Sequence, residues 1–135
     1  MVPLKPKYRG RKEYALVYCR LIAAAIGKEH VNYDEISKIM FGKPIEGLGM
    51  AGHVGYLLGE INENEAKYDR PMLSAVVIGK NNYPGPGFYA FAEENLGKLQ
   101  SNATEEQRTS FFKKELDKVY STWESFINLQ LSIAI

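Results

Sequence analysis

Cysteine and histidine are scarce in this chain of 135 residues, and their scarcity excludes several kinds of site. Cys19 is the only cysteine, so the chain can form neither an internal disulfide nor a cluster of thiolate ligands. A lone thiol inside an apolar helical pattern is expected to be buried and inert, and it fits a reducing, cytoplasmic location. The histidines are His30 and His53, and only the weak pair of His53 with Glu60 has an acid near ligand spacing. We therefore predict no metal site and no cofactor.

The sequence also lacks a strong excess of charge of one sign and any long apolar run. Its formal net charge is +1, which by itself indicates no particular partner. A helix that crosses a membrane needs about 18 or more consecutive apolar residues, and no such run is present. No apolar segment directly follows the basic N-terminal residues, so no signal peptide is predicted. The apolar share of 45% is enough for the core of one ordinary domain.

Basic residues without any acid are gathered in residues 1–12. They are Lys5, Lys7, Arg9, Arg11 and Lys12. Prolines and a glycine in the same segment disfavour a helix. Two interpretations stay open: a solvated, disordered N-terminus, or a basic arm that contacts phosphates. We predict a flexible arm over residues 1–12 and a single domain over residues 13–135.

Apolar residues recur every three or four positions in three segments, which predicts helices over residues 13–26, 31–41 and 50–68. Gly27 is the predicted C-cap of the first helix. Asn32 is a good N-cap for the second helix, and Glu35 stands three residues later, as in a capping box.

The predicted third helix contains Gly52, Gly55 and Gly59. Each costs about 1 kcal/mol relative to alanine inside a helix, so a compensating reason is expected. The interpretation we favour is close packing against the alanine-rich first helix. The alternative is a surface kept bare for a ligand.

The stretch 69–97 has the clearest strand pattern and the densest turn chemistry. Residues 71–78 form an apolar run rich in β-branched residues, which predicts a buried strand. Residues 79–87 are rich in glycine, proline and asparagine, which continue neither a strand nor a helix. The aromatic residues that begin at Phe88 return the chain to the core, as a short helix or a strand. The pattern predicts a strand, a polar loop and an aromatic return, which together form a β-wing.

The last predicted helix begins after Thr104 and runs to about Asn128. Thr104 and Gln107 match a capping box. Residues 129–135, from Leu129 to Ile135, are largely apolar, which predicts packing on the domain or contact with a second copy. Together these elements predict an α+β, mainly helical domain of winged-helix type with a short β-wing and a long C-terminal helix. Its second and third helices would form a helix-turn-helix pair.

Residues 32–78 resemble the C-terminal DNA-binding domain of the alkylguanine-DNA alkyltransferases and the alkyltransferase-like proteins. The run Asn-Tyr-Asp-Glu-Ile-Ser over 32–37 stands where that family has Thr-Tyr-Gly-Glu-Ile-Ala. Gly-His-Val-Gly over 52–55 stands in place of Arg-Ala-Val-Gly on the recognition helix, and 71–78 in place of the Pro-Cys-His-Arg-Val strand. The resemblance implies a DNA-binding fold.

Residues 13–124 also resemble a family of small bacterial and phage proteins that are sometimes joined to nucleases. The shared features are a Pro-Leu-x-Ala-Leu-Val-Val type strand at 71–77, a Pro-Gly-x-Gly-Phe turn at 84–88 and Val-Tyr-x-x-Trp at 119–123. This resemblance implies a common fold but no particular activity.

Departures from these patterns argue against catalysis. Met72 stands near the alkyltransferase nucleophile and Gly52 at its arginine finger, so alkyl transfer is excluded. A metal-dependent nuclease would need an acid two residues before Lys80, where Ile78 stands. Ser74 has no histidine base at a recognisable spacing, and Gly85-x-Gly87 is too short for a phosphate loop. An enzyme is therefore the least supported class.

Two residues of opposite charge frame the junction between the third helix and the strand. Glu60 lies near the buried face of the helix, and Arg70 comes just before the strand. We predict that they form a structural ion pair that fixes this corner.

Two functions are consistent with the sequence. The first is a non-enzymatic DNA-binding protein, in which the basic arm and Lys80 contact phosphates while His53 and Tyr56 face the groove. The wing would add three further contacts, from Asn81, Asn82 and Tyr83.

The alternative is an accessory or inhibitor, such as one encoded by a phage, that binds a nucleotide, a metabolite or a protein. Its pocket would lie between the glycine-rich third helix and the aromatic loop over residues 83–89. Residues 129–135 would then form a homodimer.

Overall fold

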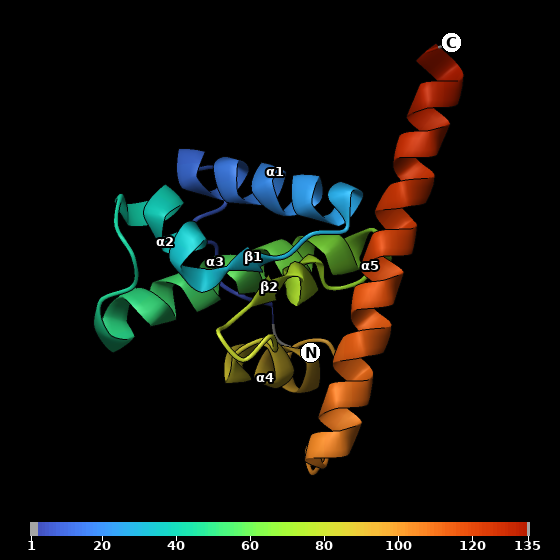
Figure 1. Ribbon diagram of the computed structural model, residues 1–135. Helices are drawn as coiled ribbons and strands as arrows, with labels where there is room; N and C mark the ends of the chain where they lie inside the picture. The colour runs from blue at the N-terminus through green and yellow to red at the C-terminus, as the bar shows by residue number, and fades with distance from the viewer. Residues whose placement is uncertain (1–2, 135) are drawn as a thin grey trace.

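The computed structural model describes residues 3–134, with side chains described up to Leu129. Eight elements follow one another along the chain (Figure 1). They are α1 (Lys12–Gly27), β1 (Val31–Asn32), α2 (Tyr33–Phe41), α3 (Gly47–Lys67), the 3₁₀ helix η1 (Leu73–Val76), β2 (Val77–Ile78), α4 (Pro86–Glu94) and α5 (Glu105–Ala134). The fold is mainly helical, and α5 runs along one side and projects past the other elements at both ends.

The predicted N-caps of α2 and α5, which join residues three positions apart, are confirmed. The Asn32 side chain accepts the N–H of Glu35 at 2.9 Å. Before α5, Thr104 Oγ1 accepts the N–H of Gln107 at 3.2 Å, and Gln107 Oε1 accepts the N–H of Thr104 at 2.9 Å. These bonds satisfy N–H groups that a helix start leaves without partners. α1 ends one residue later than predicted, with Lys28 rather than Gly27 in the left-handed region.

The sheet is smaller than predicted. β1 and β2 pair in parallel over two residues each, with Val31 opposite Val77 and Asn32 opposite Ile78. Residues 73–76 of the expected strand form η1, because the apolar run marks burial, which a short helix satisfies equally well. After the turn, Pro86 begins α4 at the first helical position, where its missing N–H costs nothing. Among the described residues, no second wing strand follows β2.

Residues 79–83 form a compact turn instead of an extended wing. The N–H of Gly79 donates to the carbonyl of Tyr83 at 2.9 Å, and Asn81 Oδ1 accepts the N–H of Tyr83 at 3.1 Å. Asn82 adopts a φ of 66°, a region that asparagine tolerates. Lys80, Asn82 and Tyr83 are exposed, and the Tyr83 ring also meets Phe112 of α5 edge-on at 5.9 Å.

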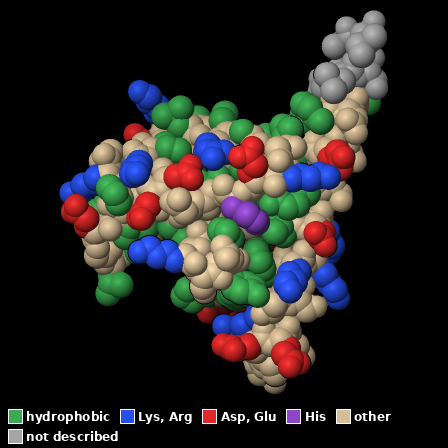
Figure 2. Space-filling view, in the orientation of Figure 1, with side chains coloured by type: hydrophobic (Ala, Val, Ile, Leu, Met, Phe, Trp, Pro, Cys, Tyr) green, Lys and Arg blue, Asp and Glu red, His purple; other side chains and the backbone are tan. Residues whose placement is uncertain are grey.

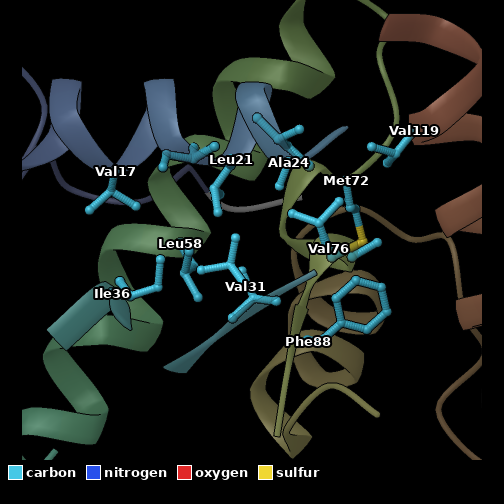
Figure 3. Packing of buried hydrophobic residues seen from close by; sticks show 14 of the residues in the cluster. Val17, Leu21, Ala24, Val31, Ile36, Leu58, Met72, Val76, Phe88 and Val119 are labelled. Carbon is cyan, nitrogen blue, oxygen red and sulfur yellow. The ribbon is translucent and has the colours of Figure 1, made fainter. Parts of the chain in front are cut away.

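One apolar core joins the helices around η1. Figure 3 shows Val17, Leu21 and Ala24 of α1 together with Met72, Val76 and Val119 from the segments they pack against. α5 contributes Val119 and Trp123 to this core. Cys19 is exposed, contrary to the expectation of a buried thiol, because it lies on the outer side of α1.

The C-terminal part of α5 leaves the core. Phe126 and Leu129 are 47% and 58% exposed. Of the apolar stretch 129–135, the side chains after Leu129 lie outside the described residues. In the part of the chain that the structure describes, no helix has the length and hydrophobicity to cross a membrane.

Three buried glutamates connect segments that are distant in the sequence. They are Glu60, Glu65 and Glu115, each at most 2% exposed. The Glu65 carboxylate accepts the Tyr18 hydroxyl and pairs with Arg70, whose Nε and Nη2 lie 2.5 and 3.0 Å from its oxygens. Hydrogen bonding to Glu65 raises the pKa of Arg70, and burial raises the pKa of Tyr18. Glu115 accepts the N–H of Met72 at 2.9 Å and Lys98 Nζ at 2.8 Å.

The predicted ion pair of Arg70 with Glu60 was wrong. The carboxylate of Glu60 instead accepts the backbone N–H groups of Lys7 and Tyr8, each at 2.8 Å. Arg70 donates its own backbone N–H to the carbonyl of Glu65, so the turn after α3 places its side chain over that residue. The corner is therefore fixed by an ion pair, as expected, but with a different acid.

Candidate ligand-binding cleft

The basic N-terminal segment is bound along α3. The N–H of Leu4 donates to Glu63 at 2.7 Å, and the hydroxyl of Tyr56 donates to the carbonyl of Lys5 at 2.6 Å. Three of its cations face neighbouring side chains: Arg9 lies 3.5 Å from Glu63, Lys7 lies over the Tyr56 ring, and Arg11 lies over the Tyr8 ring. Lys5, Arg11 and Lys12 remain exposed. The boundary predicted after residue 12, between a flexible arm and the single domain, stays a prediction.

His53 and Tyr56, predicted to face a groove, are half-buried beside this segment. The hydroxyl of Tyr8 lies 2.6 Å from His53 Nδ1, and the rings of Tyr8 and Phe41 contact His53 edge-on. The structure thus brings the arm, His53 and Tyr56 together. Between described residues, no hydrogen bond or ion pair joins this group to the turn over residues 80–83.

A cleft of about 540 Å³ lies between α3 and the beginning of α4. Its lining residues share one property: none carries a charged side chain. They are Tyr33, Ile45, Leu48, Ala51, Gly52, Gly55, Leu58, Gly59, Asn62, Ser74, Gly85, Pro86, Gly87, Phe88 and Phe91. Figure 3 shows Leu58 on α3 and Phe88 on α4, which belong to its two walls. Figure 2 shows that apolar side chains also reach the surface between charged groups on the face it presents.

The three glycines of α3 have different roles. A Cβ built on Gly59 would lie 3.2 Å from Leu4 Cδ1 and 3.3 Å from Phe91 Cε2, so Gly59 permits close packing. This packing is against the N-terminal segment and α4, not against the alanines of α1 as expected. A Cβ on Gly52 or Gly55 would meet no atom within 4 Å. These two glycines therefore leave the wall of the cleft bare without any packing requirement.

Asn62 and Ser74 are the buried polar side chains of the cleft, at 2% and 4% exposure. The N–H of Ser74 donates to Asn62 Oδ1 at 3.1 Å, and Asn62 Nδ2 donates to Ser74 Oγ at 2.7 Å. Because a backbone N–H can only donate, the first bond fixes which end of the amide is oxygen. The pair thereby ties α3 to η1.

Tyr33, the first residue of α2, is bonded to the opposite wall of the cleft, at the start of α4. Its hydroxyl oxygen accepts the N–H of Gly85 at 2.6 Å, directly before α4. Burial raises the pKa of Tyr33, and the hydrogen bond from Gly85 partly offsets that rise. The phenol is therefore protonated at neutral pH.

The arrangement is suited to binding. A cleft of this volume with apolar walls and a few fixed polar groups is typical of small-molecule sites. In the described residues, no group of three His, Cys, Asp or Glu side chains could hold a metal ion. The lining residues include no carboxylate, imidazole, thiol or cation.

The sequence anticipated part of this site. Under the alternative interpretation, a pocket between the third helix and the loop over residues 83–89, the expected walls include Gly52, Gly55, Gly85 and Phe88. These residues line the cleft. Tyr83 and Tyr89, at the ends of the predicted aromatic loop, do not. Asn62, Ser74 and Tyr33 were missed as cleft residues. A polar asparagine on an otherwise apolar helix face was the available signal for the first of them.

Comparisons with known proteins add no relative. No protein-family model, no curated protein and no solved structure matches the chain. The case for a function therefore depends on the geometry of the cleft and on the exposed surface.

Proposed function

We propose that the protein binds a small, uncharged and largely apolar molecule in the cleft between α3 and α4. The observation that carries this proposal is the open space beside Gly52 and Gly55. Glycine inside a helix costs about 1 kcal/mol relative to alanine, and here no neighbouring atom requires it. A ligand that approaches the bare backbone gives these glycines a reason.

The walls of the cleft support the proposal because they are held in place. The Tyr33 hydroxyl fixes Gly85 at the start of α4, and the Asn62–Ser74 pair fixes α3 to η1. A cleft whose walls are already positioned loses little conformational entropy when a ligand enters. The absence of charged lining residues favours a neutral ligand, because a buried charge without a partner is costly.

The proposal is tested by titrating the ¹⁵N-labelled protein with naphthalene, a flat neutral probe. We expect concentration-dependent shifts of the backbone amides of Gly52, Gly55 and Gly87. A second cavity of about 470 Å³, lined by Leu4, Leu96 and others, is the internal control. Shifts confined to that cavity, or no saturable shift, would contradict the proposal.

A second candidate function is nucleic-acid binding through the N-terminal segment and the turn over residues 79–83. It is favoured by the exposure of Lys80, Asn81 and Asn82 in a fixed turn, and by the exposed cations of the N-terminal segment. The resemblance of residues 32–78 to a DNA-binding domain adds support. Homodimer formation through residues 129–135 also stays a prediction.

Lys80→Ala tests the nucleic-acid candidate. We expect weaker binding to duplex DNA. The slope of the logarithm of the affinity against the logarithm of the salt concentration should also become shallower by about one unit, because one phosphate contact is lost. Fluorescence anisotropy at several salt concentrations measures both, with Lys118→Ala on α5 as the matched control. Asn82 is left unchanged, because alanine at its positive φ would add strain. Binding that is absent, or insensitive to salt, in the parent would exclude this candidate.

A further inference from the structure

We infer that the cleft selects neutral rings that carry a hydrogen-bond acceptor, such as a ring nitrogen or a carbonyl oxygen. This inference rests on the proposed function and specifies the class of ligand. It depends on the hydroxyl groups of Ser74 and Tyr33, two residues that line the same cleft.

The orientation of the Ser74 hydroxyl follows from its partner. Asn62 Oδ1 already faces the N–H of Ser74, so the amide nitrogen must be the group 2.7 Å from Ser74 Oγ. Ser74 Oγ therefore accepts this bond, and its own proton points elsewhere. Among the described residues, no hydrogen bond takes up that proton.

The hydroxyl of Tyr33 is in the same situation. Its oxygen accepts the N–H of Gly85, which can only donate, so the phenolic proton is not used in that bond. The structure gives it no acceptor in the part of the chain that it describes. Both hydroxyls are thus donors whose protons are free to meet a ligand.

The rest of the lining narrows the class further. The cleft has no cation to pair with an anionic ligand and no acid to pair with a cationic one. Apolar side chains such as Leu58, Phe88 and Phe91 provide surface for a flat ring. A donor left without an acceptor in such a site is costly, so a ligand that supplies the acceptor is preferred over one of the same shape without it.

The matched probes are quinoline and naphthalene, which share a shape but differ by one ring nitrogen. Naphthalene is the more hydrophobic, so the informative quantity is the quinoline-to-naphthalene affinity ratio in each protein. We expect this ratio to fall about tenfold in Ser74→Ala or in Tyr33→Phe, the equivalent of one lost hydrogen bond. Naphthalene accepts no hydrogen bond, so its affinity in each variant measures any change in the walls of the cleft, and the ratio removes that change from the comparison.

Ser110→Ala on the exposed side of α5 is the control, and its ratio should equal that of the parent. If Ser74→Ala fails to fold, Tyr33→Phe decides the result. An unchanged ratio in every folded variant would overturn the inference while naphthalene binding still supported the proposed function. Stronger binding of 2-naphthoate than of naphthalene would also overturn it. If neither neutral ring shifted the cleft amides, the proposed function itself would fall.

Discussion

Gly55→Ala is expected to raise the melting temperature of the protein and, at the same time, to weaken naphthalene binding. Alanine removes a helix penalty of about 1 kcal/mol, which corresponds to roughly 4 °C for a domain of this size. The added methyl meets no protein atom within 4 Å, so crowding does not offset this gain. Gly55→Leu extends further into the cleft and should reduce naphthalene affinity more than about tenfold. Differential scanning calorimetry and amide titration measure the two effects.

Gly59→Ala is the matched control on the same helix. Its methyl would lie 3.2–3.3 Å from Leu4 and Phe91, and such overpacking typically costs about 1–3 kcal/mol. We therefore expect this variant to be less stable than Gly55→Ala. A destabilised Gly55→Ala, or a Gly55→Leu protein that binds naphthalene as the parent does, would show that the glycine face is not a ligand wall.

Glu65→Ala should produce the largest loss of stability, about 3 kcal/mol, the value typical of a broken buried ion pair. The substitution leaves Arg70 without its acid and removes the acceptor of the Tyr18 hydroxyl, at a position that is fully buried. Part of the Arg70 side chain reaches solvent, which limits the penalty. Urea unfolding followed by circular dichroism gives the free energy of unfolding.

The exposed Glu94 of α4 provides the control for this prediction. Glu94→Ala should change the free energy of unfolding by no more than about 0.5 kcal/mol. If Glu65→Ala were equally mild, Glu65 would not be the residue that fixes the junction between α1, α3 and η1.

Local signals in the sequence were sufficient for the helix ends. Asn32, and Thr104 with Gln107, cap their helices because each bond joins residues three positions apart. The strand was overestimated because an apolar run indicates burial, and the single neighbouring strand is only two residues long. The wing was wrongly predicted because Pro86 is compatible with both a turn and a helix start, and here it begins α4.

Contacts between residues that are distant in the sequence, including those that hold the cleft, are less visible in the sequence. Glu60 and Glu65 lie on the same helix, and only the path of the chain after α3 decides which of them meets Arg70. The Asn62–Ser74 bond and the Tyr33–Gly85 bond join residues 12 and 52 positions apart, beyond any local pattern. The glycine spacing in α3 did indicate a bare surface, but only the neighbouring atoms separate Gly59 from Gly52 and Gly55.

The most direct test of the cleft as a binding site is the measurement of intermolecular nuclear Overhauser effects with bound naphthalene. Binding in the cleft predicts effects between the naphthalene protons and the Hα protons of Gly52 and Gly55, together with the ring of Phe88. Effects at Leu4 and Leu96 instead would place the ligand in the second cavity and would contradict the proposed function.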